Sequence, residues 1–176
     1  MWTFKQINDQ LLIAGAYNGL HIFSKKSNTW TYQNHLKNFS ISSRYFEILD
    51  DTELLVSHEY KGIYKLTMDE AKTAIVSVKQ LPDVPKSTYS SLRLFEDDIY
   101  YFSKAGFFRY DNTQNKLIKN DSISQLFNED NFTTAKMVVD SDAYLWLFGR
   151  NNLYQLKKGA LTNDLLVNKL PIAYDT

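Results

Sequence analysis

The residues best suited to chemistry in this sequence are acidic pairs, which recur along the chain. They are Asp50 with Asp51, Asp97 with Asp98, and Asp140 with Asp142. Two carboxylates on either side of a sugar can hydrolyse a glycosidic bond. Each pair, however, follows a short apolar segment, and Asn8-Asp9 stands at the same place near the amino terminus. A feature that recurs in every unit serves the repeat, and Asp and Asn stabilise tight turns, so we expect turns at these positions.

The histidines His21, His35 and His58 are the other candidates for acid–base or metal chemistry, and no two of them have metal-binding spacing. Later units carry aromatic residues where His21 stands, so we expect His21 to be a packing residue. His58 is followed by Glu59 in an expected loop. A hydrogen-bonded loop residue is the favoured interpretation for His58, and a ligand contact is the alternative.

Other common catalytic signatures are absent from the sequence. The chain has no cysteine, which excludes disulfides, thiol catalysis and cysteine-ligated zinc. Asp140-Ser141-Asp142 lacks the later Gly and Glu of a calcium loop. No nucleophile elbow, phosphate-binding loop or dinucleotide fingerprint is present. We therefore expect no enzyme activity, no cofactor and no metal.

The charge balance and hydropathy exclude two classes of partner. The 20 basic and 20 acidic residues give a formal net charge of zero, whereas binding to a nucleic acid duplex needs an excess of positive charge. No apolar run is long enough to span a bilayer, and Met1-Trp2-Thr3-Phe4-Lys5 does not resemble a signal peptide. We expect no direct nucleic acid binding and no membrane segment. The abrupt start in strand-like sequence favours a piece of a longer protein.

A short phrase that occurs four times organises these residues. Its copies are Gly19–Phe23, Gly62–Leu66, Gly106–Tyr110 and Asn152–Leu156. They begin 43, 44 and 46 residues apart, and each is preceded by a strand-like run, an acidic or amide turn and a second apolar run. A period of about 40–45 residues built from short strands is typical of β-propeller blades.

The repeat predicts an all-β fold, a β-propeller with four four-stranded antiparallel blades in a single domain spanning 1–176. The expected blades cover about 3–33, 42–80, 88–119 and 132–172. A helical turn could occur within 68–72 and another within 122–127. Four blades can close a small ring, but an arc of a larger propeller is favoured. An arc would expose one blade face at each end, to be covered by the remaining blades or by another copy of the chain.

The fourth unit resembles the two-component regulator propeller repeat. The resemblance lies in Asp140–Phe148, an acidic turn followed by a strand with Trp146, and in Asn152–Leu156. The other three units lack the tryptophan. The segment 55–62 is also similar to propellers of flavobacterial regulators, which continue into a triple-tyrosine domain, a membrane helix and a helix-turn-helix domain. The resemblance implies a sensory module that is periplasmic or otherwise extracytoplasmic, with relatives in gut Bacteroidetes that sense glycan fragments.

Loops between second and third strands, and loops between blades, emerge on one side of a propeller. The candidate ligand-binding residues there are Tyr17, Asn18, His58, Glu59, Tyr60, Lys61, Lys104, Arg150 and Asn151. Aromatic rings that stack and polar groups that fix orientation suit a glycan or peptide ligand.

Together these observations favour a non-catalytic ligand-sensing module of a bacterial signal-transduction or transcriptional regulator. One alternative is a scaffold propeller that binds other proteins. The other is a propeller glycosidase or lyase, in which Lys5, Glu47 and Arg93, at equivalent first-strand positions, would meet near the central channel.

Overall fold

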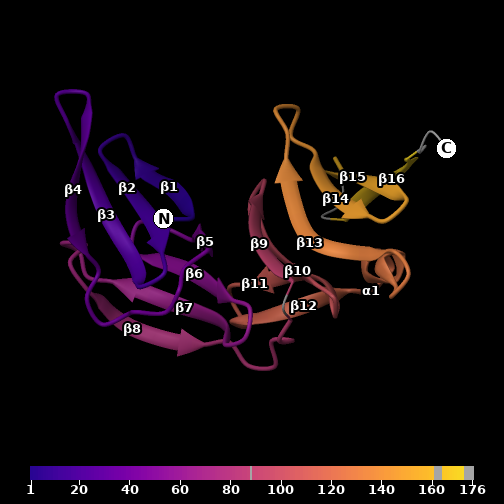
Figure 1. Ribbon diagram of the computed structural model, residues 1–176, viewed down its shortest axis with the longest axis horizontal. Helices are drawn as coiled ribbons and strands as arrows, with labels where there is room; N and C mark the ends of the chain where they lie inside the picture. The colour runs from indigo at the N-terminus through magenta and orange to yellow at the C-terminus, as the bar shows by residue number, and fades with distance from the viewer. Residues whose placement is uncertain (88, 161–163, 173–176) are drawn as a thin grey trace. The chain divides into compact units, whose positions relative to one another are not determined.

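The computed structural model describes residues 1–87, 89–160 and 164–172. The chain divides into two compact units, Met1–Lys86 and Ser87–Thr176, each of which is described by itself. The described residues form four separate four-stranded antiparallel sheets, two in each unit (Figure 1). The predicted all-β class and the four antiparallel sheets are thus confirmed.

The first unit holds two sheets whose strands pair in chain order. The first sheet consists of β1 (Thr3–Asn8), β2 (Leu11–Ala16), β3 (Gly19–Lys26) and β4 (Thr29–His35). The second consists of β5 (Tyr45–Ile48), β6 (Glu53–His58), β7 (Gly62–Met68) and β8 (Ile75–Gln80).

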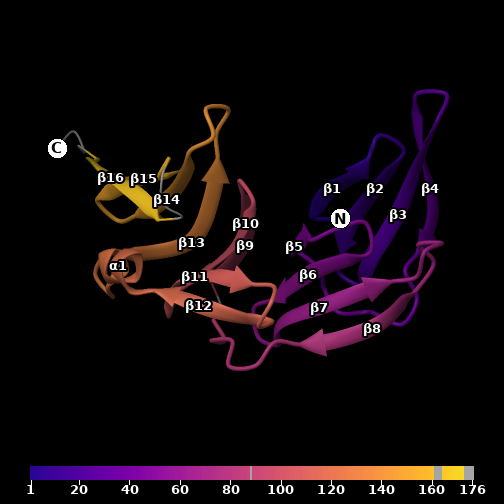
Figure 2. The same cartoon turned by 180° about the vertical axis from the view of Figure 1, so that it is seen from behind.

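The second unit repeats this arrangement, seen from behind in Figure 2. The third sheet consists of β9 (Ser90–Phe95), β10 (Asp98–Ser103), β11 (Gly106–Asp111) and β12 (Lys116–Asn120). A helical turn, α1 (Asp121–Ser124) and η1 (Gln125–Phe127), follows. The fourth sheet consists of β13 (Phe132–Val139), β14 (Leu145–Gly149), β15 (Asn152–Lys158) and β16 (Leu165–Pro171). The expected blade boundary at residue 88 lies outside the described residues.

The two helical turns expected from the sequence have different outcomes. The one within 122–127 is present, and Asn120 caps it by accepting a hydrogen bond from the Ile123 amide at 2.9 Å. The one within 68–72 is absent. There the carboxylate of Asp69 accepts hydrogen bonds from the Thr73 and Ala74 amides at 2.7 and 3.0 Å. These bonds close a turn that returns the chain directly into β8.

The recurring acidic or amide residues form turns in three of the four sheets, between the first and second strand of each. Asn8, Asp50 and Asp140 each accept backbone hydrogen bonds from residues two to four positions ahead. In the third sheet the turn between β9 and β10 instead contains Glu96 in the left-handed region, with φ of 51°. Asp98 there pairs with Arg109 at 3.4 Å and with Lys158 of the fourth sheet at 3.0 Å.

Each sheet has two faces, which we call face A and face B. In the first sheet, cross-strand register places Phe4, Ala14 and His21 on face A, and Lys5, Ile13 and Ile22 on face B. The core of the first unit joins Ile13, Leu20 and Ile22 of face B to the second sheet, which contributes Phe46, Leu54, Val56 and Leu66. Phe46 pairs with Val56 just as Phe4 pairs with Ala14, so Phe46 and Val56 lie on face A of the second sheet. Leu54 and Leu66, which pair two positions along, lie on the same face.

The second unit packs in the same way. The face B residues Tyr100, Phe102 and Phe107 of the third sheet share a core with Met137, Leu147 and Tyr154 on face A of the fourth. In both units the first strands of the two sheets contact one another, β1 with β5 and β9 with β13. Fourth strands are the most exposed, as expected for strands with one wet face.

Candidate functional site

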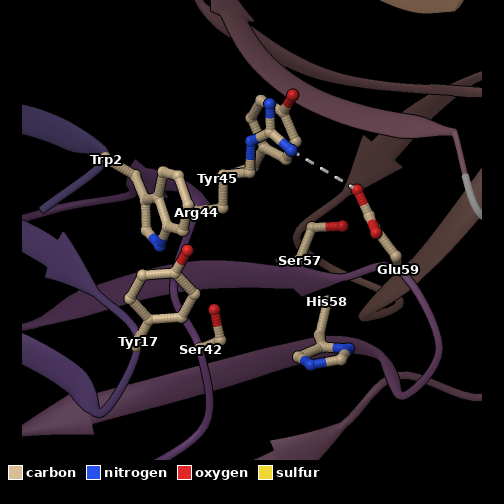
Figure 3. Close-up of a pocket in the computed structure, with 8 residues that line it drawn as sticks. All are labelled: Trp2, Tyr17, Ser42, Arg44, Tyr45, Ser57, His58 and Glu59. Atoms are coloured by element: carbon tan, nitrogen blue, oxygen red, sulfur yellow. Dashed lines mark ion pairs between the residues drawn. The ribbon is translucent and has the colours of Figure 1, made fainter.

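A pocket of about 250 Å³ lies in the first unit, at the ends of its two sheets (Figure 3). Four segments supply its walls: the residue before β1, the loop after β2, the connection into β5, and the end of β6. The lining residues are Trp2, Tyr17, Ser42, Arg44, Tyr45, Ser57, His58 and Glu59. The pocket therefore combines aromatic rings, hydroxyl groups and both signs of charge.

Trp2 and Tyr17 form the aromatic wall. Their rings meet edge to face with centroids 4.4 Å apart. The Trp2 backbone amide donates to the Gly15 carbonyl at 2.8 Å, which extends the β1–β2 pairing and fixes the backbone that carries the indole. Tyr17 is 71% exposed, so most of its ring is open to a ligand. Such rings offer flat apolar surfaces against which a sugar or a side chain can stack.

Arg44 provides the positive charge of the pocket. Its guanidinium lies 5.5 Å from the Trp2 ring centroid and 5.2 Å from the Tyr45 ring centroid. It also pairs with Glu59 at 3.8 Å, with the Arg44 side chain about half exposed (Figure 3). An exposed ion pair of this length contributes little stability, about 0–1 kcal/mol. The guanidinium can therefore turn to an incoming acceptor at small cost.

The backbone that carries Arg44 is fixed against the first sheet. The Ser43 amide donates to the Ala16 carbonyl at 2.9 Å, and the Thr3 hydroxyl donates to the Arg44 carbonyl at 2.6 Å. Gly15 allows this approach, because a Cβ at that position would lie 1.9 Å from the Ser43 carbonyl oxygen. The geometry of the pocket thus depends on a glycine in β2.

The surroundings of His58 favour the neutral form of its ring. Burial is the main cause that lowers its pKa, and the Lys61 charge adds to this effect, while Glu59 opposes it. The Nδ1 atom accepts a hydrogen bond from the Tyr60 amide at 3.2 Å. The proton of the neutral ring therefore belongs on Nε2, where it can serve as a donor.

The structure brings together some of the residues expected from the sequence. Tyr17, His58 and Glu59 line the pocket. Asn18 does not, because its side-chain oxygen faces His21 Nε2 at 2.9 Å and its carbonyl faces His35 Nε2 at 2.8 Å. Tyr60 is exposed beside the pocket, and the Lys61 carbonyl accepts from the Gln80 amide group at 2.6 Å.

The three candidates in the second unit have other local roles. Lys104 pairs with Glu129 at 3.4 Å, both being well exposed. The Arg150 amide donates to the Asn131 carbonyl at 2.9 Å, and the Asn151 carbonyl accepts from Ile172 at 2.9 Å. A pocket of about 200 Å³ in this unit is lined by other residues, Tyr100, Arg109, Ile118, Lys119, Asn120, Asp164 and Leu165.

Five lining residues were not expected from the sequence: Trp2, Ser42, Arg44, Tyr45 and Ser57. Trp2 lies before the first strand of the repeat, and the others lie beside or within strands rather than in the loop after a second strand. The sequence did offer a reason to consider Arg44, since the connection between blades was expected on the same side as those loops. None of the predicted ligand-binding residues, however, lies in the connection that holds Arg44.

The channel residues of the enzyme alternative are partly paired. Lys5 Nζ and Glu47 Oε2 lie 2.5 Å apart, and Glu47 is almost wholly buried. Glu47 therefore meets a cation rather than a second carboxylate. Arg93 belongs to the second unit. His21 lies between the rings of Tyr32 and His35, with centroids at 6.0 and 4.9 Å, as expected of a packing residue.

No family model matches this sequence, and no curated protein matches it. Within the described residues, no group of three or more His, Asp or Glu side chains is arranged to hold a metal ion. No helix in that part of the chain is both long and apolar enough to cross a membrane.

Proposed function

We propose that this chain is an arc of a β-propeller that binds a small ligand without transforming it. The observation that carries the proposal is the pocket, where the loop after β2, the connection before β5 and the end of β6 converge. These are the segments that a propeller gathers on one side. Tyr17 and His58, which the repeat predicts as ligand-binding residues, both line this pocket.

Three features of the fold support the propeller. Each sheet is a four-stranded meander in chain order. First strands contact each other within each unit, as strands nearest a shared axis would. In both units face B of one sheet packs on face A of the next. Radial stacking of successive blades produces this alternation.

The contents of the pocket favour a glycan or short peptide as the ligand. Trp2 and Tyr17 can stack on a sugar ring or a side chain, and Arg44, His58 and Ser57 can fix its polar groups. The carboxylates that could do acid–base chemistry have other partners, since Glu47 pairs with Lys5 and Asp50 and Asp140 close turns. This use of the acids supports a binding role over a glycosidase or lyase.

The wider role in the proposal rests on the resemblance of 140–156 to regulator propellers. On that ground the chain would be the sensor part of a bacterial signal-transduction or transcriptional regulator and would lie outside the cytoplasm. Ligand binding would shift an existing equilibrium in domains that follow.

The direct test is calorimetry of the chain against a panel of oligosaccharides and short peptides. We expect at least one class to bind, and Tyr17→Ala to weaken that binding about tenfold, or about 1.4 kcal/mol. Tyr60→Ala is the matched control, because Tyr60 is also an exposed loop tyrosine but does not line the pocket. Tyr60→Ala should leave the affinity unchanged.

Two outcomes would count against the proposal. Failure of the whole panel to bind would favour the scaffold alternative, in which only proteins bind. Consumption of an oligosaccharide during the titration, abolished by Glu47→Gln, would establish the enzyme alternative instead.

A further inference from the structure

Face A of the first sheet carries apolar side chains on all four strands and is largely uncovered. Phe4 is 56% exposed and Tyr32 is 54% exposed. Phe23 lies between them, with ring centroids 6.5 Å from Phe4 and 5.6 Å from Tyr32. Leu12 pairs with Phe23 on the neighbouring strand, and Trp30 extends the row under the Lys25 ammonium at 5.7 Å. A contiguous aromatic surface of this kind marks an interaction site.

The equivalent faces of other sheets show what covers such a surface. On face A of the second sheet, Phe46, Leu54 and Leu66 are wholly buried against face B of the first sheet. On face A of the fourth sheet, Met137 and Tyr154 are buried against face B of the third. Within each described unit, a face B therefore covers the face A of the sheet that follows it.

A partly exposed face B is present at the other end of the chain. Register places Trp146, Phe148 and Leu153 on face B of the fourth sheet. The corresponding residues of the third sheet, Tyr100, Phe102 and Phe107, are buried in the core of the second unit. Trp146, Phe148 and Leu153 are only half-buried.

We propose that face A of the first sheet binds face B of the fourth sheet of a second copy of this chain. The inference rests on the propeller proposed above. The partner is a second copy because the chain itself carries both halves of an interface that it already forms twice, once in each unit. The contact joins two different surfaces, so it is heterologous, and a pair joined by one such contact still has one free face A and one free face B.

Sedimentation velocity over a range of concentrations tests the proposal on the whole chain. We expect the mass to rise with concentration to twice that of one chain and beyond, because a pair still has a free face of each kind. The double variant Phe4→Glu/Tyr32→Glu, which alters exposed side chains of face A, should raise the dissociation constant by about tenfold or more. Leu153→Glu on face B should do the same. Val76→Glu is the matched control, because Val76 is 63% exposed on β8 of the second sheet and so lies on neither of the two faces proposed to meet.

Mixing the two kinds of variant separates this contact from a symmetric one. Each variant alone should associate at least tenfold more weakly than the unmodified chain, whereas the mixture should form a dimer at the unmodified affinity, because one intact face A meets one intact face B. If the face A variant is monomeric while Leu153→Glu still dimerises, the contact is between two copies of face A and the proposal is wrong. A chain that stays monomeric at every concentration also overturns it.

The same samples keep this test independent of the proposed function. Each variant is titrated with the oligosaccharides and peptides described above, since none of the substituted residues lines the pocket. A monomeric chain that still binds a ligand would overturn only the self-association. A dimer that binds none of the probes would support the contact and count against the ligand-binding role.

Discussion

Lys5 and Glu47 join the first strands of two neighbouring sheets, with Nζ and Oε2 2.5 Å apart. The Glu47 side chain is 2% exposed and the Lys5 side chain 21%. A carboxylate this deeply buried is tolerated only when it is paired. The pair therefore fixes how β1 and β5 lie against each other.

Removing the cation should be costly. Lys5→Met leaves the Glu47 carboxylate buried without its partner, and we expect a loss of about 3 kcal/mol in the free energy of unfolding. Glu47→Gln keeps an oxygen acceptor for Lys5 and should cost less. Urea denaturation of both variants measures the difference. Equal stability of Lys5→Met and the unmodified chain would show that the pair contributes nothing.

The turn at Asp50 should contribute stability that depends on pH. Partial burial opposes ionisation of Asp50, but hydrogen bonds from the Thr52 and Glu53 amides and the Thr52 hydroxyl outweigh it and lower its pKa. This stability is present above the ordinary carboxyl pKa and is lost as the pH falls through the lowered value. Asp50→Ala should lose about 1 kcal/mol at neutral pH. Asp50→Asn retains an acceptor, so it should keep most of the stability without the acid dependence.

Gly15 should not tolerate a side chain. A Cβ there would lie 1.9 Å from the Ser43 carbonyl oxygen, so the connection that carries Arg44 must shift. We expect Gly15→Ala to lose about 1–3 kcal/mol and to weaken ligand binding. Thermal unfolding and calorimetry measure the two effects. Ser42→Ala, in the same connection, should leave stability unchanged, and a fully stable Gly15→Ala would contradict this account of the pocket.

Acid should destabilise the first sheet through His21. Burial, followed by the His35 charge and the amino terminus, lowers the His21 pKa. Its Nδ1 atom is covered by neighbouring atoms and has no hydrogen-bond partner, so protonation there would leave an N–H group without an acceptor. The unfolded chain then takes up the proton first, so stability should fall as the pH drops below about 6.5.

His21→Phe tests this titration, because Phe108 occupies the equivalent position on the third sheet. The variant should lose part of the dependence of stability on pH between about 5 and 7. His58, whose pKa is also lowered by burial, keeps its own share. An unchanged pH profile in His21→Phe would show that His21 does not titrate between the folded and unfolded states.

The parts of the fold set by local patterns could be predicted from the sequence. Apolar runs separated by Asn8, Asp50 and Asp140 gave the strands and turns, because these side chains bond to the backbone beside them. Glu96 departs from this rule: its turn depends on a left-handed backbone, which no residue type there indicates.

The pocket could be predicted only in part. Tyr17 and His58 were found because equivalent loops of a repeat emerge on one side. Trp2 and Arg44 were missed because their positions depend on tertiary contacts with Gly15, Ala16 and Thr3 rather than on the repeat. Asn18 was assigned to the site because the sequence cannot show that its side chain turns toward His21.

The central claim, ligand binding in the pocket of the first unit, can be tested with the indole N–H signals of the chain's three tryptophans. Trp2 lines the pocket, whereas Trp30 and Trp146 do not and serve as internal controls. In a two-dimensional ¹⁵N spectrum recorded during titration with the panel of oligosaccharides and peptides, the Trp2 signal should move and saturate while the other two stay fixed. A Trp2 signal that does not move with any of these probes would contradict the account.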